Sequence, residues 1–219
     1  MADMEITYFG HSCFKLKTKD LTVIIDPFDP EKLGIKLPKL ECDAVLLTHA
    51  HFDHNYKEGV SGYRLLVDGP GEYELTGVKI MGIPTKHGGD EVEGGMQNTM
   101  YYIEAEDGVA VLHCGDLGHT LDDATLEKFG EVTALLIPVG GIYTIDAEKA
   151  SKVISSIEPA FVVPMHFRTE GSKINNIDTL EKFLDEMGLE NGAVKRLTSL
   201  KISSADNEVE TQVIVLEKQ

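Results

Sequence analysis

The segment His49 to His54, with the sequence HAHFDH, has the composition and spacing of a metal-binding site. Imidazole nitrogens bind zinc and similar ions, and carboxylate oxygens are harder ligands for the same ions. The apolar run AVLLT before it predicts a buried strand that ends at the first histidine. Alternate residues of a strand point the same way, so His49 and His51 can converge on one ion. Asp53 and His54 lie past the turn and can face a second ion, which distinguishes the segment from a polar surface loop.

Three further strand ends carry residues that could complete a two-metal site. GIPTKH ends in His87, VLHCGD in Asp116 and VVPMH in His166. Each follows an apolar run and precedes a loop, where functional groups gather at one rim of a sheet. His113 and His119 are close enough in sequence to compete with His87. His113 is more typical of a buried histidine or of one that supports a ligand, and His119 of a loop at the outer rim.

The elements that must position these residues are mainly strands in the first half of the chain and alternating helices and strands in the second. The first half and the terminus contain short β-rich runs, predicted as strands at 5–10, 13–18, 21–26, 43–49, 63–68, 77–83, 99–105, 108–114 and 208–217. A hairpin is expected around residues 106–108. In the second half, helices near 122–129, 146–157 and 178–187 alternate with strands at 133–139 and 160–166. Asp178 and Glu181 have capping-box spacing. The order predicts two sheets covered by helices.

Composition limits the classes of protein that this chain could be. Its 219 residues, with neither a repeat nor a linker, predict a single domain over 1–219. The net charge of −17 makes nucleic acid an unfavourable partner, because that binding depends on basic residues that neutralise phosphates. We expect no secretory signal and no membrane span. Three cysteines without a CxxC pair indicate a reducing compartment, so the expected location is cytoplasmic.

The segments THAHFDH, GD at Asp116 and PMHF at His166, in this order, resemble the metallo-β-lactamase superfamily. GHS at His11, IIDPF at Asp26, HCGDLGH and IPVGGIYTID resemble its branch of small metal-dependent hydrolases related to ascorbate-phosphate lactonases. The resemblance covers about residues 8–167. It implies an α/β fold, a four-layer αββα sandwich, with two metal ions between the sheet edges.

By position, the resemblance also implies a role for each residue of the site. The first ion would be bound by His49, His51 and His87, and the second by Asp53, His54 and His166, with Asp116 bridging the two. Asp53 and Asp116 would thus act in catalysis as well as in metal binding. Asp26 would accept a hydrogen bond from the ring nitrogen of a ligand histidine that does not face the metal, and so set the tautomer of that histidine.

Other residues near these motifs have less specific expectations. His11, in a turn between two strands, is expected to make a structural hydrogen bond or to contact substrate. Arg168 could hold an anionic group of a substrate, or it could be a solvated surface residue. Tyr143 could reach the pocket, while Thr144 or Asp146 could cap the following helix. The glycine-rich stretch 88–98 is a candidate lid, and the cysteines are expected to be buried.

Two adjacent divalent ions lower the pKa of a shared water, so the site predicts attack by hydroxide on a carbonyl or phosphorus centre. The resemblance to the hydrolase branch implies a small ester or lactone, phosphorylated or not, as the substrate. Zinc is the default ion, with manganese, iron or nickel as alternatives. Related di-iron redox proteins carry Glu at the position of His51, which favours hydrolysis here. The alternatives are a metal-dependent phosphodiesterase or nuclease and a non-catalytic metal-binding protein. The expected partner is a small-molecule substrate, and a homo-oligomer fits a soluble enzyme of this kind.

Overall fold

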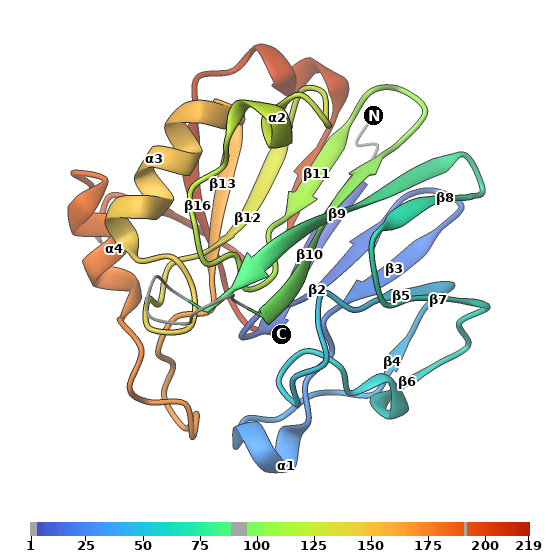
Figure 1. Cartoon of the computed structure of the whole chain (residues 1–219), viewed down its shortest axis with the longest axis horizontal. Helices are drawn as coiled ribbons and strands as arrows, with labels where there is room; N and C mark the ends of the chain where they lie inside the picture. Colours follow the sequence, from blue (N-terminus) through green and yellow to red (C-terminus); the bar gives the residue numbers. More distant parts are fainter. Residues whose placement is uncertain (1–3, 89–95, 191) are drawn as a thin grey trace.

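Two large β-sheets form the body of the protein in the computed structural model, which describes residues 4–88, 96–190 and 192–219 (Figure 1). The first sheet has six strands in the order β15 (Leu200–Ile202), β1 (Met4–Gly10), β2 (Cys13–Lys17), β3 (Thr22–Ile25), β5 (Ala44–Leu46) and β7 (Leu65–Val67). The second has eight, in the order β14 (Lys195–Leu197), β16 (Gln212–Leu216), β13 (Phe161–Met165), β12 (Ala134–Pro138), β11 (Ala110–His113), β10 (Met96–Glu104), β9 (Val78–His87) and β8 (Gly71–Leu75).

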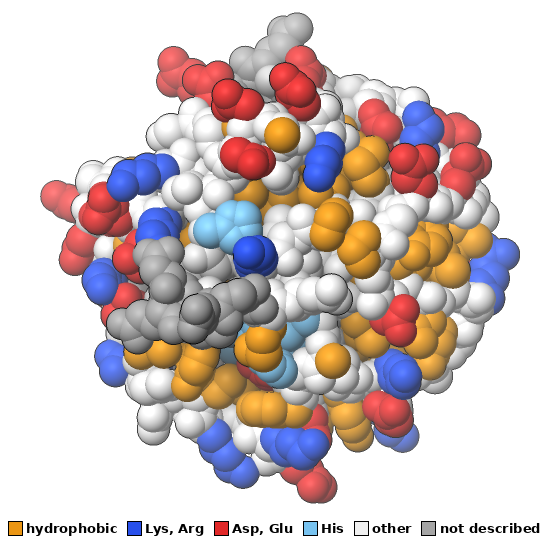
Figure 2. Space-filling view, in the orientation of Figure 1, with side chains coloured by type: hydrophobic (Ala, Val, Ile, Leu, Met, Phe, Trp, Pro, Cys, Tyr) orange, Lys and Arg blue, Asp and Glu red, His pale blue; other side chains and the backbone are white. Residues whose placement is uncertain are grey.

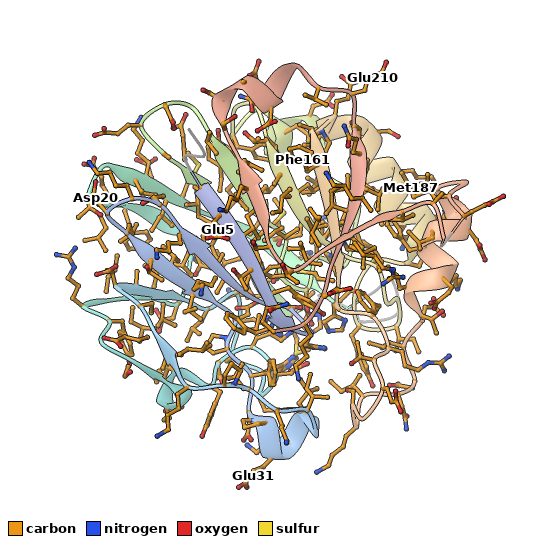
Figure 3. All side chains as sticks on the ribbon, turned by 180° about the vertical axis from the view of Figure 1, so that it is seen from behind. Glu5, Asp20, Glu31, Phe161, Met187 and Glu210 are labelled. Carbon is orange, nitrogen blue, oxygen red and sulfur yellow. The ribbon has the colours of Figure 1, made fainter. Side chains whose placement is uncertain are left out.

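Alternation of side chains explains how the first sheet is buried on both faces. Val23 and Ile25 of β3 belong to the large apolar cluster that both sheets share, while Ile24 between them belongs to a second cluster on the outer face. Successive strand residues point to opposite faces, so a run of consecutive apolar residues is what a doubly covered strand needs. Side chains fill the space between the sheets, with Glu5 on one sheet and Phe161 on the other (Figure 3).

Helices α2 (Asp123–Leu126), α3 (Ala147–Ile157) and α4 (Leu180–Glu186) lie beside the second sheet (Figure 1). Asp146 caps α3 by accepting a hydrogen bond from the Lys149 N–H, as expected for one of the two candidate caps. The predicted capping box of α4 is wrong. The helix begins after Thr179, and the Asp178 carboxylate instead accepts a hydrogen bond from Lys182 one turn along. The helix predicted near 122–129 is the single turn α2.

The outer face of the first sheet is covered by short elements. The turn of helix α1 (Pro30–Leu33), the 3₁₀ turn η1 (Lys57–Gly59) and a two-stranded sheet, β4 (Leu40–Glu41) with β6 (Val60–Ser61), supply this layer. Leu33, Leu40 and Val60 pack there with Ile24 and Val45 in one buried cluster. The predicted αββα order is therefore confirmed, with its first layer made largely of loops.

Most predicted strands are present, and five lie where none was predicted. The hairpin between β10 and β11 turns at residues 105–108, where the Gly108 N–H donates to the Ala105 carbonyl. Strands β4, β6, β14 and β15 were not predicted because they are two or three residues long, and β8 was not predicted because it contains no buried residue. The candidate lid was placed at 88–98; residues 89–95 of it lie outside the described residues, and Met96 to Asn98 belong to β10.

Strand directions bring distant loops to one edge of the two sheets. β1 and β3 are each antiparallel to β2, and β5 is parallel to β3, so these three strands end at the same edge of the first sheet. β9 and β11 are each antiparallel to β10, and β12 and β13 continue parallel to β11 in the second sheet. Within the described ranges, no helix has the length and apolar character needed to cross a membrane.

Candidate metal centre

Seven histidine and aspartate side chains predicted as metal ligands meet at this common edge, together with His11. Their ligand atoms form three groups in which all atoms lie within 4.8 Å of one another. The groups are His49, His51 and His87; His11, Asp53, His54 and His166; and His49, His54 and Asp116. Two groups of ligand atoms joined through Asp116 have the arrangement of a site for two adjacent ions.

The first group presents ring nitrogens whose tautomers are set by neighbours. Thr48 Oγ1 donates to Asp26 Oδ2 at 2.7 Å and therefore accepts from the Nδ1 of His49 at 3.0 Å. The Tyr143 carbonyl can only accept, so the Nδ1 of His87 donates to it at 2.8 Å. In both neutral rings the Nε2 lone pair then points into the site. Both Nε2 atoms are 3.1 Å from the Nδ1 of His51.

This convergence of lone pairs fits a cation. A single ring nitrogen carries at most one hydrogen, so His51 Nδ1 can satisfy only one of its two neighbours. A metal ion accepts all three lone pairs, because neutral imidazole nitrogen is a zinc-type ligand whose other nitrogen is held by a hydrogen bond. The donor set of the first group therefore fits one divalent ion.

The second group is organised around the buried carboxylate of Asp26. The Nδ1 of His54 donates to Asp26 Oδ2 at 2.7 Å, and Asp26 Oδ1 accepts from the Thr48 N–H at 2.8 Å. His54 thus turns its Nε2 toward Asp116 Oδ1, 3.1 Å away, and both atoms are buried without a hydrogen-bond partner among the described residues. Orphaned buried polar atoms are costly, and a cation between them removes that cost.

Asp116 lies between the two groups. Its Oδ2 atom has three histidine Nε2 neighbours, those of His166 at 3.4 Å, His49 at 3.6 Å and His87 at 3.8 Å. Its backbone N–H donates to Asn98 Oδ1 at 3.0 Å, and Gly115 before it has φ +55°. A Cβ at Gly115 would overlap Asn98 Oδ1, so only glycine allows this close approach. The turn therefore places the carboxylate within reach of both groups.

Burial and mutual charge shift the pKa values in opposite directions. Burial would lower the pKa of His54, but Asp116, Asp26 and Asp53 raise it well above its usual value. Burial opposes ionisation of Asp116, yet His166 and His54 hold the pKa of this carboxyl well below its usual range. Burial and the neighbouring His54 lower the pKa of His49 to about 3. The centre therefore combines ionised carboxylates with a demand for positive charge that a divalent ion meets.

Several other candidate residues are placed around the centre. His113 is buried; its Nδ1 accepts from the Gly115 N–H and its Nε2 donates to the Ser12 carbonyl, so both nitrogens are satisfied. His119 accepts from the Lys86 N–H and belongs to none of the three groups. Arg168 is exposed. Tyr143 contacts the centre through its carbonyl rather than its phenol, which accepts from Asn176 Nδ2.

Two supporting residues were missed by the sequence reasoning, Thr48 and Asn98. Thr48 links Asp26 to His49 and could have been noticed from its place directly before HAHFDH. Asn98 is buried and holds the backbone of both Cys114 and Asp116, besides donating to Thr85. No local pattern points to Asn98, because its partners come from other strands.

A cleft of about 570 Å³ opens beside the first group. His49 and His51 line it, together with charged residues from the η1 turn and the loop after β7, namely Lys57, Glu58 and Asp68. Figure 2 shows histidine side chains reaching the surface between hydrophobic ones. All three cysteines are buried and free.

The sequence matches the family described as Beta-lactamase superfamily domain over residues 5–166. The chain belongs to this family. The predicted superfamily and fold are thereby confirmed, and the closer resemblance to ascorbate-phosphate lactonases stays a prediction.

Relatives from several organisms support the same membership. A protein of Thermococcus onnurineus named UPF0173 metal-dependent hydrolase is 29% identical over 192 residues, covering 76% of this chain and 85% of its own. One of the same name from Methanopyrus kandleri is 27% identical over 218 residues, covering 85% and 94%. A crystal structure from Thermotoga maritima, described as a candidate Zn-dependent hydrolase of the metallo-β-lactamase superfamily, aligns with a TM-score of 0.76 at 33% identity, covering 98% of this chain and all of its own.

Proposed function

We propose that this protein hydrolyses a small ester or lactone, with or without a phosphate group, at a centre for two divalent metal ions. The enzyme class, a metal-dependent hydrolase of the metallo-β-lactamase superfamily, is confirmed by its relatives. The observation that carries the proposal is the cleft of about 570 Å³, which has His49 and His51 in its wall. Its size suits a small organic molecule.

The chain's own groups divide the work of the site. His49, His51 and His87 would hold one ion and Asp53, His54 and His166 the other, with Asp116 between them. When bound, such ions supply Lewis acidity and lower the pKa of a bound water toward neutrality. Asp26 and Thr48 orient His54 and His49 so that their Nε2 atoms face the ions.

The rim of the centre favours an organic substrate over a polyanion. Five large hydrophobic side chains are markedly exposed among the described residues, and three of them belong to segments that carry or contact the candidate ligands. Phe52 lies within HAHFDH, Met96 pairs with His87 across β9 and β10, and Ile142 precedes Tyr143, whose carbonyl binds His87. Exposed apolar groups around a polar site suit a substrate with an apolar part. The net charge of −17 opposes nucleic acid.

A direct comparison of substrates tests this proposal. The protein loaded with Zn²⁺ or Mn²⁺ is expected to open a sugar lactone or a simple ester faster than it cleaves bis-p-nitrophenyl phosphate. His49→Ala should lose at least about 100-fold of that rate, since even the residues behind ligands are worth 10–100-fold. His119→Ala is the matched control, because His119 lies outside the three ligand groups. A preference for the phosphodiester would establish the phosphodiesterase alternative instead.

A further inference from the structure

His11 joins the second ligand group, for which the family resemblance supplies Asp53, His54 and His166, besides the bridging Asp116. The Nε2 of His11 is 3.0 Å from Asp53 Oδ2, and all four ligand atoms lie within 4.8 Å of one another. We propose that His11 binds the second metal ion directly, as a protein ligand additional to Asp53, His54, His166 and the shared Asp116. This proposal rests on the metal centre of the proposed function and not on its substrate.

The backbone conformation at His11 orients its side chain toward the second ligand group. His11 has φ +55°, a left-handed conformation that costs a non-glycine residue energy, and it follows a register shift between β1 and β2 at Tyr8 and Gly10. Its carbonyl accepts hydrogen bonds from the Tyr8 hydroxyl at 3.1 Å and from the His166 N–H at 3.0 Å. Strained positions of this kind persist where the surroundings hold them, and they cluster at functional sites.

The distances around His11 suit ligands of one ion. Two atoms bound to zinc at about 2.0–2.1 Å in tetrahedral geometry lie roughly 3.3 Å apart, close to the separation of the His11 and Asp53 atoms. The His11 ring also lies 4.2 Å from that of His166 and 5.3 Å from that of His54, measured between centroids. All four residues are buried, with at most 6% of their surface exposed. The Nε2 of His54 has no hydrogen-bond partner among the described residues, and an ion shared by the four side chains would satisfy it.

His11 makes the two positions unequal, because with Asp116 shared between them the second ion would have five protein ligands and the first four. A zinc position whose coordination is completed by protein ligands is typical of a structural ion, whereas a catalytic ion needs a position left for water or substrate. The first group has three histidines, and two of them, His49 and His51, line the cleft. No member of the second group lines it among the described residues. The first position is therefore the one that a substrate in the cleft would reach, and the second would have more protein ligands.

Replacement of His11 by glutamine separates ligation from hydrogen bonding. A glutamine amide can still donate to Asp53 Oδ2, but it is a poor zinc ligand. We expect the wild-type protein to retain two Zn²⁺ per chain after dialysis and His11→Gln to retain about one, with affinity at the second site lowered at least about 100-fold. Two ions with unchanged affinity in His11→Gln would overturn the proposal and leave His11 as a hydrogen-bond donor.

A matched control variant and a measurement on the wild-type protein distinguish loss of a ligand from a general structural effect. His113→Gln removes another buried histidine of the same region, whose nitrogens bind only backbone groups, and should retain two ions. In wild-type protein labelled with ¹⁵N, Zn²⁺ should shift the His11 Nε2 resonance as strongly as those of His54 and His166, which requires no variant. An unshifted His11 Nε2 contradicts the proposal. A wild-type protein that binds no metal overturns the proposed function as well, so the two failures are distinguishable.

Discussion

The Asp26 carboxylate and the His54 imidazole form a fully buried pair, with 2.7 Å between Oδ2 and Nδ1. Both side chains are completely inaccessible, and Asp26 also accepts from the N–H and the hydroxyl of Thr48. One carboxylate thus fixes the tautomer of His54 directly and that of His49 through Thr48. Asp26 therefore orients one histidine in each of the two ligand groups.

Asp26→Asn should weaken metal binding without removing a ligand. The amide can present a hydrogen where the carboxylate accepted one, so His54 no longer holds its Nδ1 proton reliably. We expect Zn²⁺ affinity to fall 10–100-fold, measured by competition with a chromophoric chelator. Asp29→Asn is the control, since the Asp29 carboxylate caps the short helix α1 and pairs with Lys32, and it belongs to none of the ligand groups. Equal affinities in the two variants would show that the Asp26 contact does not orient the ligand.

Gly115→Ala should destabilise the protein more than Gly108→Ala. Both glycines have positive φ, at +55° and +82°, so alanine costs each about 1–2 kcal/mol from the backbone alone. A Cβ at Gly115 also meets Asn98 and Thr48, whereas one at Gly108 meets nothing within 4 Å. Overpacking adds roughly 1–3 kcal/mol at Gly115. Urea unfolding of both variants gives the difference, and equal losses would contradict the tight turn before Asp116.

Removal of the metal should lower the melting temperature. An ion that binds only the folded state stabilises it by RT ln(1 + [L]/Kd), about 2.7 kcal/mol when free metal is 100 times the dissociation constant. We expect EDTA-treated protein to melt earlier in a thermal scan and Zn²⁺ to restore the transition. His49→Ala should recover less of the shift, and a metal-independent transition would argue against a bound ion at this centre.

The stability of the metal-free protein should fall as pH decreases, in part through His113. Burial lowers the pKa of His113 in the folded state, while the unfolded chain titrates near 6.5. Below pH 6.5 the unfolded state binds the proton and the folded state does not, so the free energy of unfolding declines with acid until the folded pKa is reached. His113→Gln should show a slope shallower by up to about 1.4 kcal/mol per pH unit in urea titrations between pH 6.5 and 5. Parallel slopes would mean that His113 accepts a proton in the folded state.

Local patterns predicted the parts of this protein that depend on neighbours in the chain. Buried runs such as residues 43–49 and 160–166 become strands because hydrophobic periodicity is a local property. Asp146 caps α3 for the same reason. The capping assignment at Asp178 was wrong because Thr179, one residue later, has the extended backbone of the cap, and Asp178 pairs with Lys182 instead.

The sequence by itself determined the types and the order of the candidate ligands, because HAHFDH and the histidine or aspartate after each of three strands require nothing beyond local spacing. Tertiary structure decided which strand ends lie together at the centre. The parallel courses of β1, β3 and β5 bring His11, Asp26 and His49 together from loops far apart in the chain. The contact of His11 with Asp53 and the support of Asp116 by Asn98 join different strands. Such contacts depend on sheet register, which long-range packing sets and no local pattern records.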